Sequence, residues 1–170
     1  MTCDDNDATE FDVPPPNPEL KRLEPLVGTW TANDHTRDSV LGPGVPVTSR
    51  ETFCWLDGGY FLVQTYEVVF GDEPAQTGVN YWMYDAERQR FRIIFFSNNG
   101  PYSDAGNQYA GEVADDKLTM AGPARFQYDL DADGAIKPNP DGTITIEWWL
   151  QDEAGEWQPW MTNTFTRESG

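Results

Sequence analysis

The first predicted strand opens on Gly28-Thr29-Trp30, and the last one closes on Trp157-Gln-Pro-Trp160-Met-Thr-Asn-Thr-Phe-Thr-Arg167. Between them, short apolar or alternating runs are separated by turn-forming stretches such as Asp57-Gly58-Gly59 and Asp141-Gly142. Short strands at regular spacing, joined by tight turns, are typical of an antiparallel barrel or sandwich. The sequence therefore predicts an all-β fold over most of its 170 residues.

About ten strands are expected after residue 28. Their predicted bounds are Thr29–Thr36, Thr48–Leu56, Tyr60–Phe70, Thr77–Tyr84, Arg90–Ser97, Asn107–Val113, Lys117–Met120, Arg125–Leu130, Thr143–Leu150 and Trp157–Arg167. Several of these strands, such as the one around Phe91–Phe96, are apolar on both faces. A strand with one face toward an apolar cavity and the other covered by a loop, a helix or a subunit has this composition.

The N-terminal region divides at about residue 16. Residues 1–16 are acidic and then proline-rich, which predicts a solvated, disordered arm. Asn17-Pro18-Glu19 predicts the start of a short helix, with Asn17 as its cap and Pro18 at its first position. The helix is expected to end at Gly28 and to cover one end of a barrel. Residues 17–170 are then a single barrel domain.

Four segments together resemble a family of small bacterial lipocalin-like (calycin) domains of unknown function. They are Gly59–Tyr66, Gly78–Asp85, Phe91–Ser97 and the ending from Gly155 to Arg167, and the resemblance spans about residues 20–168. It implies an antiparallel lipocalin-like β-barrel of about ten strands with a short N-terminal helix.

The same resemblance implies a structural role for Trp30 and Arg167. In such barrels the guanidinium stacks on the indole and hydrogen-bonds nearby backbone carbonyls, which closes the barrel base. The two residues are therefore expected to serve barrel closure and not ligand binding.

The charge of the chain excludes several classes of partner. The net charge is −18, with only three lysines, so nucleic acid and anionic membranes are not expected as partners. No apolar run approaches the roughly 20 residues of a membrane helix, and the acidic N-terminus is unlike a signal peptide. We expect a cytoplasmic protein in which Cys3 and Cys54 are not disulfide-bonded.

The candidates for acid–base chemistry are His35, Glu67 and Tyr81. His35 is the only histidine. Haem-binding barrels of the wider group hold haem through a histidine near the end of the chain. No histidine follows residue 35 here, so the resemblance does not imply haem binding. No cluster of Cys and His suggests zinc. We expect no cofactor and no metal.

The run Asp129-Leu-Asp131-Ala-Asp133-Gly134 copies the start of a calcium-binding loop. Its twelfth position is Pro140 instead of the bidentate glutamate. Calcium binding is therefore left open by the sequence and is not assigned.

Four charged residues lie in predicted strands: Glu51, Glu67, Glu147 and Arg92. Solvated, outward positions are expected for each, because an inward charge would need a buried partner.

Three functions are compatible with the sequence. The first is binding of a small, largely apolar molecule in the barrel. The second is a cofactor-free enzyme, such as a cyclase, isomerase or hydratase, acting on a hydrophobic natural-product intermediate. The third is an interaction domain with a barrel filled by side chains, and a homodimer is compatible with all three. The residues expected to line a ligand cavity are Tyr66, Tyr81, Met83, Phe95, Trp148 and Met161.

Overall fold

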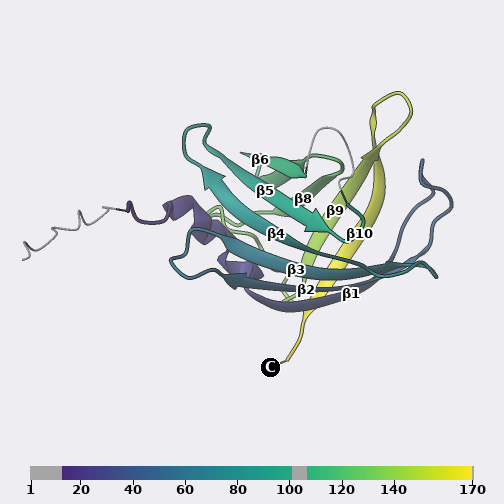
Figure 1. Ribbon diagram of the computed structural model, residues 1–170, viewed down its shortest axis with the longest axis horizontal. Coiled ribbons are helices and arrows are strands. Elements are labelled where there is room, and N and C mark those ends of the chain that lie inside the picture. The colour runs from purple at the N-terminus through teal and green to yellow at the C-terminus, as the bar shows by residue number, and fades with distance from the viewer. Residues whose placement is uncertain (1–12, 101–106, 170) are drawn as a thin grey trace, which may run out of the picture.

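The computed structural model describes residues 13–100 and 107–169. Ten antiparallel strands form a closed barrel, with one short helix before the first strand (Figure 1). The expected all-β class, strand number and helix are confirmed. The elements are η1 (Pro18–Leu26), β1 (Gly28–His35), β2 (Pro46–Trp55), β3 (Leu62–Phe70), β4 (Gln76–Asp85), β5 (Arg90–Ser97), β6 (Gln108–Ala114), β7 (Lys117–Ala121), β8 (Arg125–Asp129), β9 (Ile144–Gln151) and β10 (Trp157–Arg167).

Each strand pairs with its neighbours in the sequence, and β1 pairs with β10 to close the barrel. At that closure Trp30 lies opposite Arg167. The pairing of β9 with β10 shifts register between Pro159 and Met161. Pro159 lacks an N–H and cannot donate to a sheet ladder, so its place at a bulge is the expected one.

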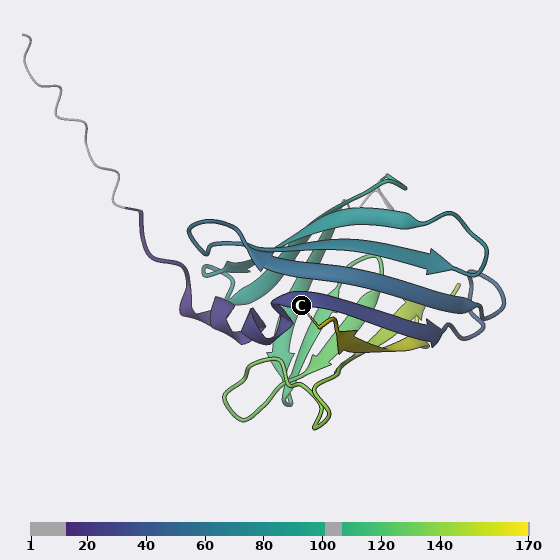
Figure 2. The same ribbon diagram turned by 90° about the horizontal axis from the view of Figure 1, so that it is seen from below.

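The helix η1 lies across one end of the barrel (Figure 2). The Asn17 side chain accepts a hydrogen bond from the Glu19 N–H at 3.0 Å, which confirms the predicted cap. The helix is of the 3₁₀ type and contains Pro25, which has no N–H to donate to the helix. Its apolar side chains, Leu20, Leu23 and Leu26, are buried against the barrel core.

Most of the predicted N-terminal arm, and Cys3 within it, lies outside the described residues. Residues 13–16 of that arm have neither helix nor strand. The Tyr60 hydroxyl donates a hydrogen bond to the Pro14 carbonyl at 2.6 Å, so this part of the chain lies beside the turn before β3.

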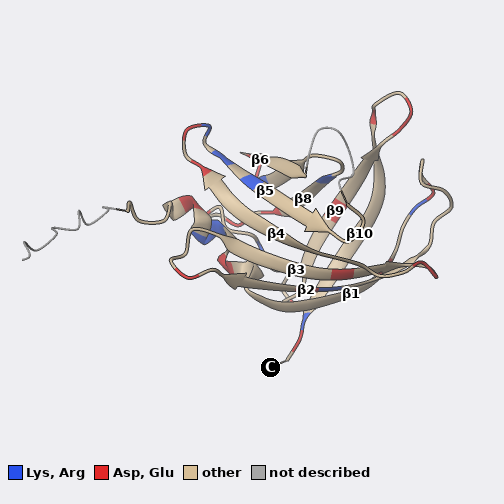
Figure 3. Ribbon diagram, in the orientation of Figure 1, with Lys and Arg blue, Asp and Glu red and all other residues tan. Residues whose placement is uncertain are grey.

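Alternation along each strand separates an inner face from an outer face. In β2, for example, Val47, Ser49, Glu51 and Phe53 are buried, whereas the residues between them are exposed or half-buried. The charged residues gather largely at the turns between strands and at the strand ends (Figure 3). No helix among the described residues has the length and apolar character needed to cross a membrane.

Candidate functional site

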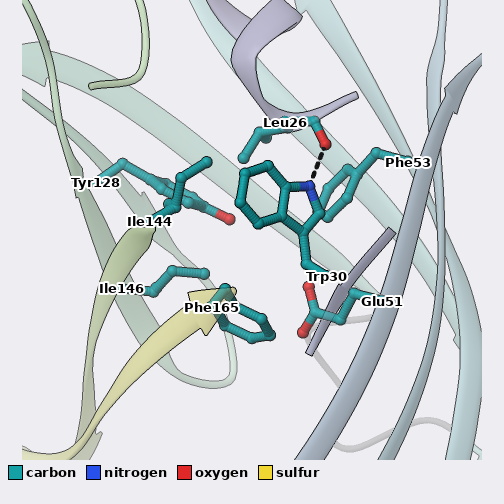
Figure 4. A pocket seen from close by; sticks show the side chains of 8 residues that line it. All are labelled: Leu26, Trp30, Glu51, Phe53, Tyr128, Ile144, Ile146 and Phe165. Carbon is teal, nitrogen blue, oxygen red and sulfur yellow. Dashed lines mark hydrogen bonds between the residues drawn. The ribbon is translucent and has the colours of Figure 1, made fainter. Parts of the chain in front are cut away.

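The barrel interior beside η1, which we call the closed half, is filled by side chains. Eight of them point toward one another and leave a void of only about 10 Å³ (Figure 4). That volume holds one water molecule at most. The eight are Leu26, Trp30, Glu51, Phe53, Tyr128, Ile144, Ile146 and Phe165. This void has no room for an organic ligand.

Glu51 is the one charged residue at this void. Its side chain is only 7% exposed, so the expectation that it points into solvent is wrong. Burial raises the pKa of Glu51 to about 7, although a hydrogen bond from Gln64 opposes the shift. Burial also raises the pKa of the neighbouring Tyr128 well above its usual value, and the charge of Glu51 adds to that shift.

Gln64 links Glu51 to two further side chains on β4. Its Nε2 donates to Glu51 Oε2 at 2.8 Å. Its Oε1 accepts from Trp82 Nε1 and from Asn80 Nδ2, both at 2.8 Å. The result is a polar wall that runs from β2 across β3 to β4 on the inner face of the barrel.

The interior away from η1, which we call the open half, is lined by inward-facing side chains that remain partly exposed. Tyr66, Val68 and Gln76 share the inner faces of β3 and β4 and are half-buried. Trp148 and Leu150 have the same character on β9. Their partial exposure shows that solvent reaches these inward-facing side chains at this end of the barrel.

Aromatic side chains form the opposite wall of the open half. The ring centroids of Phe95 and Tyr109 are 5.4 Å apart, those of Tyr109 and Phe126 are 5.3 Å apart, and those of Phe126 and Trp148 are 4.6 Å apart. Trp82 contacts Phe126 edge-on at 6.0 Å, from the closed half. This aromatic row therefore lies where the packed core meets the open half.

Three buried polar atoms near this boundary have no hydrogen-bond partner among the described residues. They are Asn80 Oδ1 and Asn107 Oδ1, which are acceptors, and Trp148 Nε1, a donor. An unsatisfied buried polar group is costly, and native proteins usually pair such groups with protein, water or ligand. Asn80 and Trp148 belong to strands on different sides of the barrel, since β4 and β9 are not neighbours.

Gly78 makes room for Tyr66 on the inner wall. A Cβ atom at Gly78 would lie 2.4 Å from the Tyr66 hydroxyl oxygen and 2.3 Å from the Phe96 carbonyl oxygen. The tyrosine ring therefore lies over the glycine backbone on the neighbouring strand, where any larger residue would displace it.

The six residues predicted to line a cavity fall on two different faces. Tyr66, Phe95, Trp148 and Met161 share the inner faces of their strands. Tyr81 and Met83 alternate with the buried Trp82 and lie on the outer face of β4. Tyr81 contacts Phe96 edge-on with ring centroids 6.4 Å apart, and Phe96 is 53% exposed.

The three predicted acid–base residues are not brought together. Glu67 is exposed on the outer face of β3, and Tyr81 lies on the outer face of β4. His35 ends β1, is exposed, and its Nδ1 lies 2.7 Å from the Thr36 carbonyl oxygen. The alternation of side chains along a strand explains these positions, because each of the three residues is adjacent to an inward-facing residue of its strand.

Trp30 and Arg167 form a stacked pair at the barrel end covered by η1. The Arg167 guanidinium lies 4.5 Å from the Trp30 ring centroid and donates to the Pro25 carbonyl at 3.1 Å. Trp30 Nε1 in turn donates to the Leu26 carbonyl at 2.7 Å (Figure 4). The pair thus ties the first strand, the last strand and the helix together.

The aspartate-rich loop after β8 uses its carboxylates within the protein. Asp131 Oδ1 accepts from the backbone N–H groups of Asp133 and Ala135, each at 2.9 Å. Asp129 pairs with Lys117. Among the described residues there is no group of three or more His, Cys, Asp or Glu side chains placed to hold a metal ion.

A second hollow, of about 150 Å³, lies on the surface between η1 and the strands β4, β5 and β6. Its polar contributors include Arg22, which forms an ion pair with Glu19 at 2.9 Å. Burial, reinforced by the charge of Glu19, raises the pKa of Tyr84 here. The hollow lies at the barrel end beside η1, where Tyr84, Phe91 and Gly111 contribute from the inner faces of their strands.

The residues that build the polar wall were not singled out together from the sequence. Gln64 and Asn80 were not considered as site residues, and Glu51 was expected outside. The alternation of side chains along a strand indicates an inward position for all three, because residues two apart share a face. Glu51 is two residues from the buried Phe53, Gln64 is two from Leu62, and Asn80 is two from Trp82.

Comparison with known proteins bears on the fold and the family. The crystal structure of Rv2717c from M. tuberculosis superposes with a TM-score of 0.58 at 14% sequence identity. The match covers 91% of this chain and 99% of that protein, and it shows a shared fold. No protein with a curated description matches the sequence. The family model of DUF1579, described as a protein of unknown function, matches residues 15–167, and the chain therefore belongs to the DUF1579 family.

Proposed function

We propose that this protein binds a small, largely apolar molecule in the open half of the barrel, in the manner of a lipocalin-like carrier. The observation that carries the proposal is the pair of unpartnered buried atoms, Asn80 Oδ1 and Trp148 Nε1, in an aromatic and partly solvent-accessible interior. Ligand pockets are mostly apolar and present a few placed polar groups.

The lining that supports the proposal comes from both walls. Asn80 belongs to the polar wall, Tyr66 lies on the inner face of β3, and Phe95, Trp148 and Met161 supply apolar surface. Affinity comes from burying apolar ligand surface, at roughly 25 cal/mol per Å² before the costs of ordering.

The test compares two adjacent tryptophans on β9. Trp148 faces the interior, whereas Trp149 lies on the outer face with its ring centroid 4.7 Å from the Arg125 guanidinium. N-phenyl-1-naphthylamine, a neutral apolar dye, is titrated by fluorescence against the wild type and the Trp148→Ala and Trp149→Ala variants. We expect saturable binding that Trp148→Ala weakens about tenfold and Trp149→Ala leaves unchanged.

Native mass spectrometry of freshly purified protein provides an independent check, because a bound molecule adds a mass that disappears on denaturation. If the dye does not bind, or if both tryptophan variants weaken its binding equally, the open half is not a ligand site.

A second candidate function, a cofactor-free enzyme, is favoured by one observation. Glu51 is a buried carboxyl group whose pKa is raised to about 7, which suits proton transfer at neutral pH. Its test is whether a molecule bound in the open half is chemically altered by the wild type and not by Glu51→Gln. If neither the wild type nor the Glu51→Gln variant alters the molecule, the protein binds it without catalysing a reaction.

A further inference from the structure

The orientation of the Gln64 amide is fixed by its neighbours. An indole N–H can only donate, so Trp82 Nε1, at 2.8 Å, must face the carbonyl oxygen of Gln64. The Gln64 NH₂ group is thereby directed at Glu51, which accepts. Glu51 and Trp82 together leave Gln64 no alternative arrangement.

That orientation decides what Asn80 presents. The Gln64 oxygen also accepts from the Asn80 NH₂ group at 2.8 Å, which fixes the orientation of the Asn80 amide. The atom left without any partner is Asn80 Oδ1, which can only accept a hydrogen bond. At this atom the polar wall offers an acceptor, and a molecule that matches it carries an N–H or O–H donor.

Apart from Arg167 at the end covered by η1, the charges on the inner faces are negative. Glu51 is buried beside the polar wall, and Asp34 lies on the inner face of β1, where Asn163 donates to it at 3.1 Å. All 11 Lys and Arg residues lie within the described part of the chain, and none is on an inner face of the open half. The inward-stacked Arg167 is at the opposite end.

The basic residues of the strands do not lie on the inner faces of the open half. Arg50 pairs with Glu168, Arg92 with Gln108, and Lys117 with Asp129. Arg125 lies over the outer tryptophans Trp149 and Trp157. An anionic headgroup entering the open half would approach the Asp34 carboxylate, with Glu51 beyond the polar wall and no compensating cation, which costs more in a low-dielectric interior than in water.

We propose, building on the ligand site proposed above, that the open half selects an uncharged apolar molecule with a hydroxyl group and rejects apolar carboxylates. The hydroxyl donates to Asn80 Oδ1, and its own oxygen, or a second acceptor on the ligand, can accept from Trp148 Nε1. The apolar remainder lies along the aromatic wall.

The experiment displaces bound N-phenyl-1-naphthylamine with three probes of nearly equal length at pH 8. 1-Decanol is neutral and can donate, methyl nonyl ether is neutral and can only accept, and decanoate is anionic. We expect 1-decanol to displace the dye at concentrations about tenfold lower than either of the others, since one hydrogen bond or one uncompensated charge has at least this effect.

Variants test the atom that makes the selection. Asn80→Ala removes the acceptor and should reduce the preference for 1-decanol over the ether to near unity, while ether binding stays within about twofold of the wild type. Asn33→Ala, on the exposed outer face of β1, is the matched control and should keep the full preference. Trp148→Phe keeps a ring and removes the indole N–H, so it probes the second atom without relying on Asn80→Ala to fold.

If decanoate bound as tightly as 1-decanol, the argument from charge would be overturned. If methyl nonyl ether bound as tightly as 1-decanol, the argument that the ligand needs a hydrogen-bond donor would be overturned. Equal binding of all three would end the selectivity proposal while leaving an apolar site. Failure of the dye itself to bind would instead remove the site on which the proposal rests.

Discussion

The closed half and the open half of this barrel are built from the same alternating strands, but they differ in how completely their inner side chains are buried. In the closed half, inner side chains such as Trp82 and Ile93 are about 1% exposed and η1 covers the opening. In the open half, inner side chains such as Tyr66 and Trp148 remain half-buried, and buried polar atoms such as Asn80 Oδ1 and Trp148 Nε1 lack partners among the described residues. The first half carries stability, and the second is free to carry function.

The largest expected effect separates the halves by stability. Trp82→Ala removes a buried ring that contacts Phe53, Phe126 and Tyr128, and it leaves Gln64 with one donor fewer. We expect a loss of about 3–5 kcal/mol in the free energy of unfolding. Trp148→Ala, where solvent already reaches the side chain, should cost less than half as much. Urea denaturation measures both, and equal losses would mean that the open half is also a packed core.

The next effect is a pH dependence that belongs to Glu51. Its native pKa of about 7 lies above the ordinary value of 4.5, so the native state holds more protons between these values. Its favourable contribution is complete below pH 4.5 and is lost as pH rises through about 7. Ionisation of the buried group costs on the order of 3 kcal/mol across that window.

Glu51→Gln should remove this dependence. Denaturation midpoints at pH 5 and pH 8 should show the variant gaining stability relative to the wild type at the higher pH. Glu67→Gln, on the exposed face of β3, is the control and should run parallel to the wild type. A Glu51→Gln curve parallel to the wild type would place the Glu51 pKa in the ordinary range.

A smaller effect is expected at the barrel end. Arg167→Lys loses the stacking on Trp30 and the bond to the Pro25 carbonyl, and a lysine ammonium reproduces this planar geometry poorly. We expect a loss of about 1 kcal/mol with dye binding unchanged. Arg50→Lys, whose exposed partner is Glu168, should change stability by less. A loss of dye binding in Arg167→Lys would show that the halves are coupled.

The smallest effect is expected on the outer face. Cys54 is a free, exposed cysteine on β2 that alternates with the buried Phe53. Cys54→Ser should change the free energy of unfolding by less than about 0.5 kcal/mol and leave dye binding unaltered. A larger loss in denaturation would indicate that Cys54 packs against another part of the chain.

The fold was accessible from the sequence because turns and alternation are local signals. Asp57-Gly58-Gly59 and Asp141-Gly142 mark strand boundaries, and simple alternation along β3 puts Leu62, Gln64 and Tyr66 on one face. These signals need only the covalent geometry of neighbouring residues. They do not require knowledge of which face is the inner one.

The site was less accessible because it depends on that choice of face. Tyr81 and Trp82 are adjacent aromatics in a strand that is apolar on both sides, and only the register with Leu62 and Ile93 shows that Trp82 points inward. For Glu51, a buried carboxyl contradicts the usual preference of charged residues for solvent. Its burial depends on Gln64, a residue 13 positions away.

The pairing of β1 with β10 sets a condition on synthesis. Because Trp30 finds Arg167 only at the far end of the chain, a ribosome must release β10 before the barrel can close. Until then the emerging chain is an open sheet with two unpaired edges, and such edges recruit other strands. A nascent chain stalled before residue 157 should therefore need chaperone protection that the finished barrel does not.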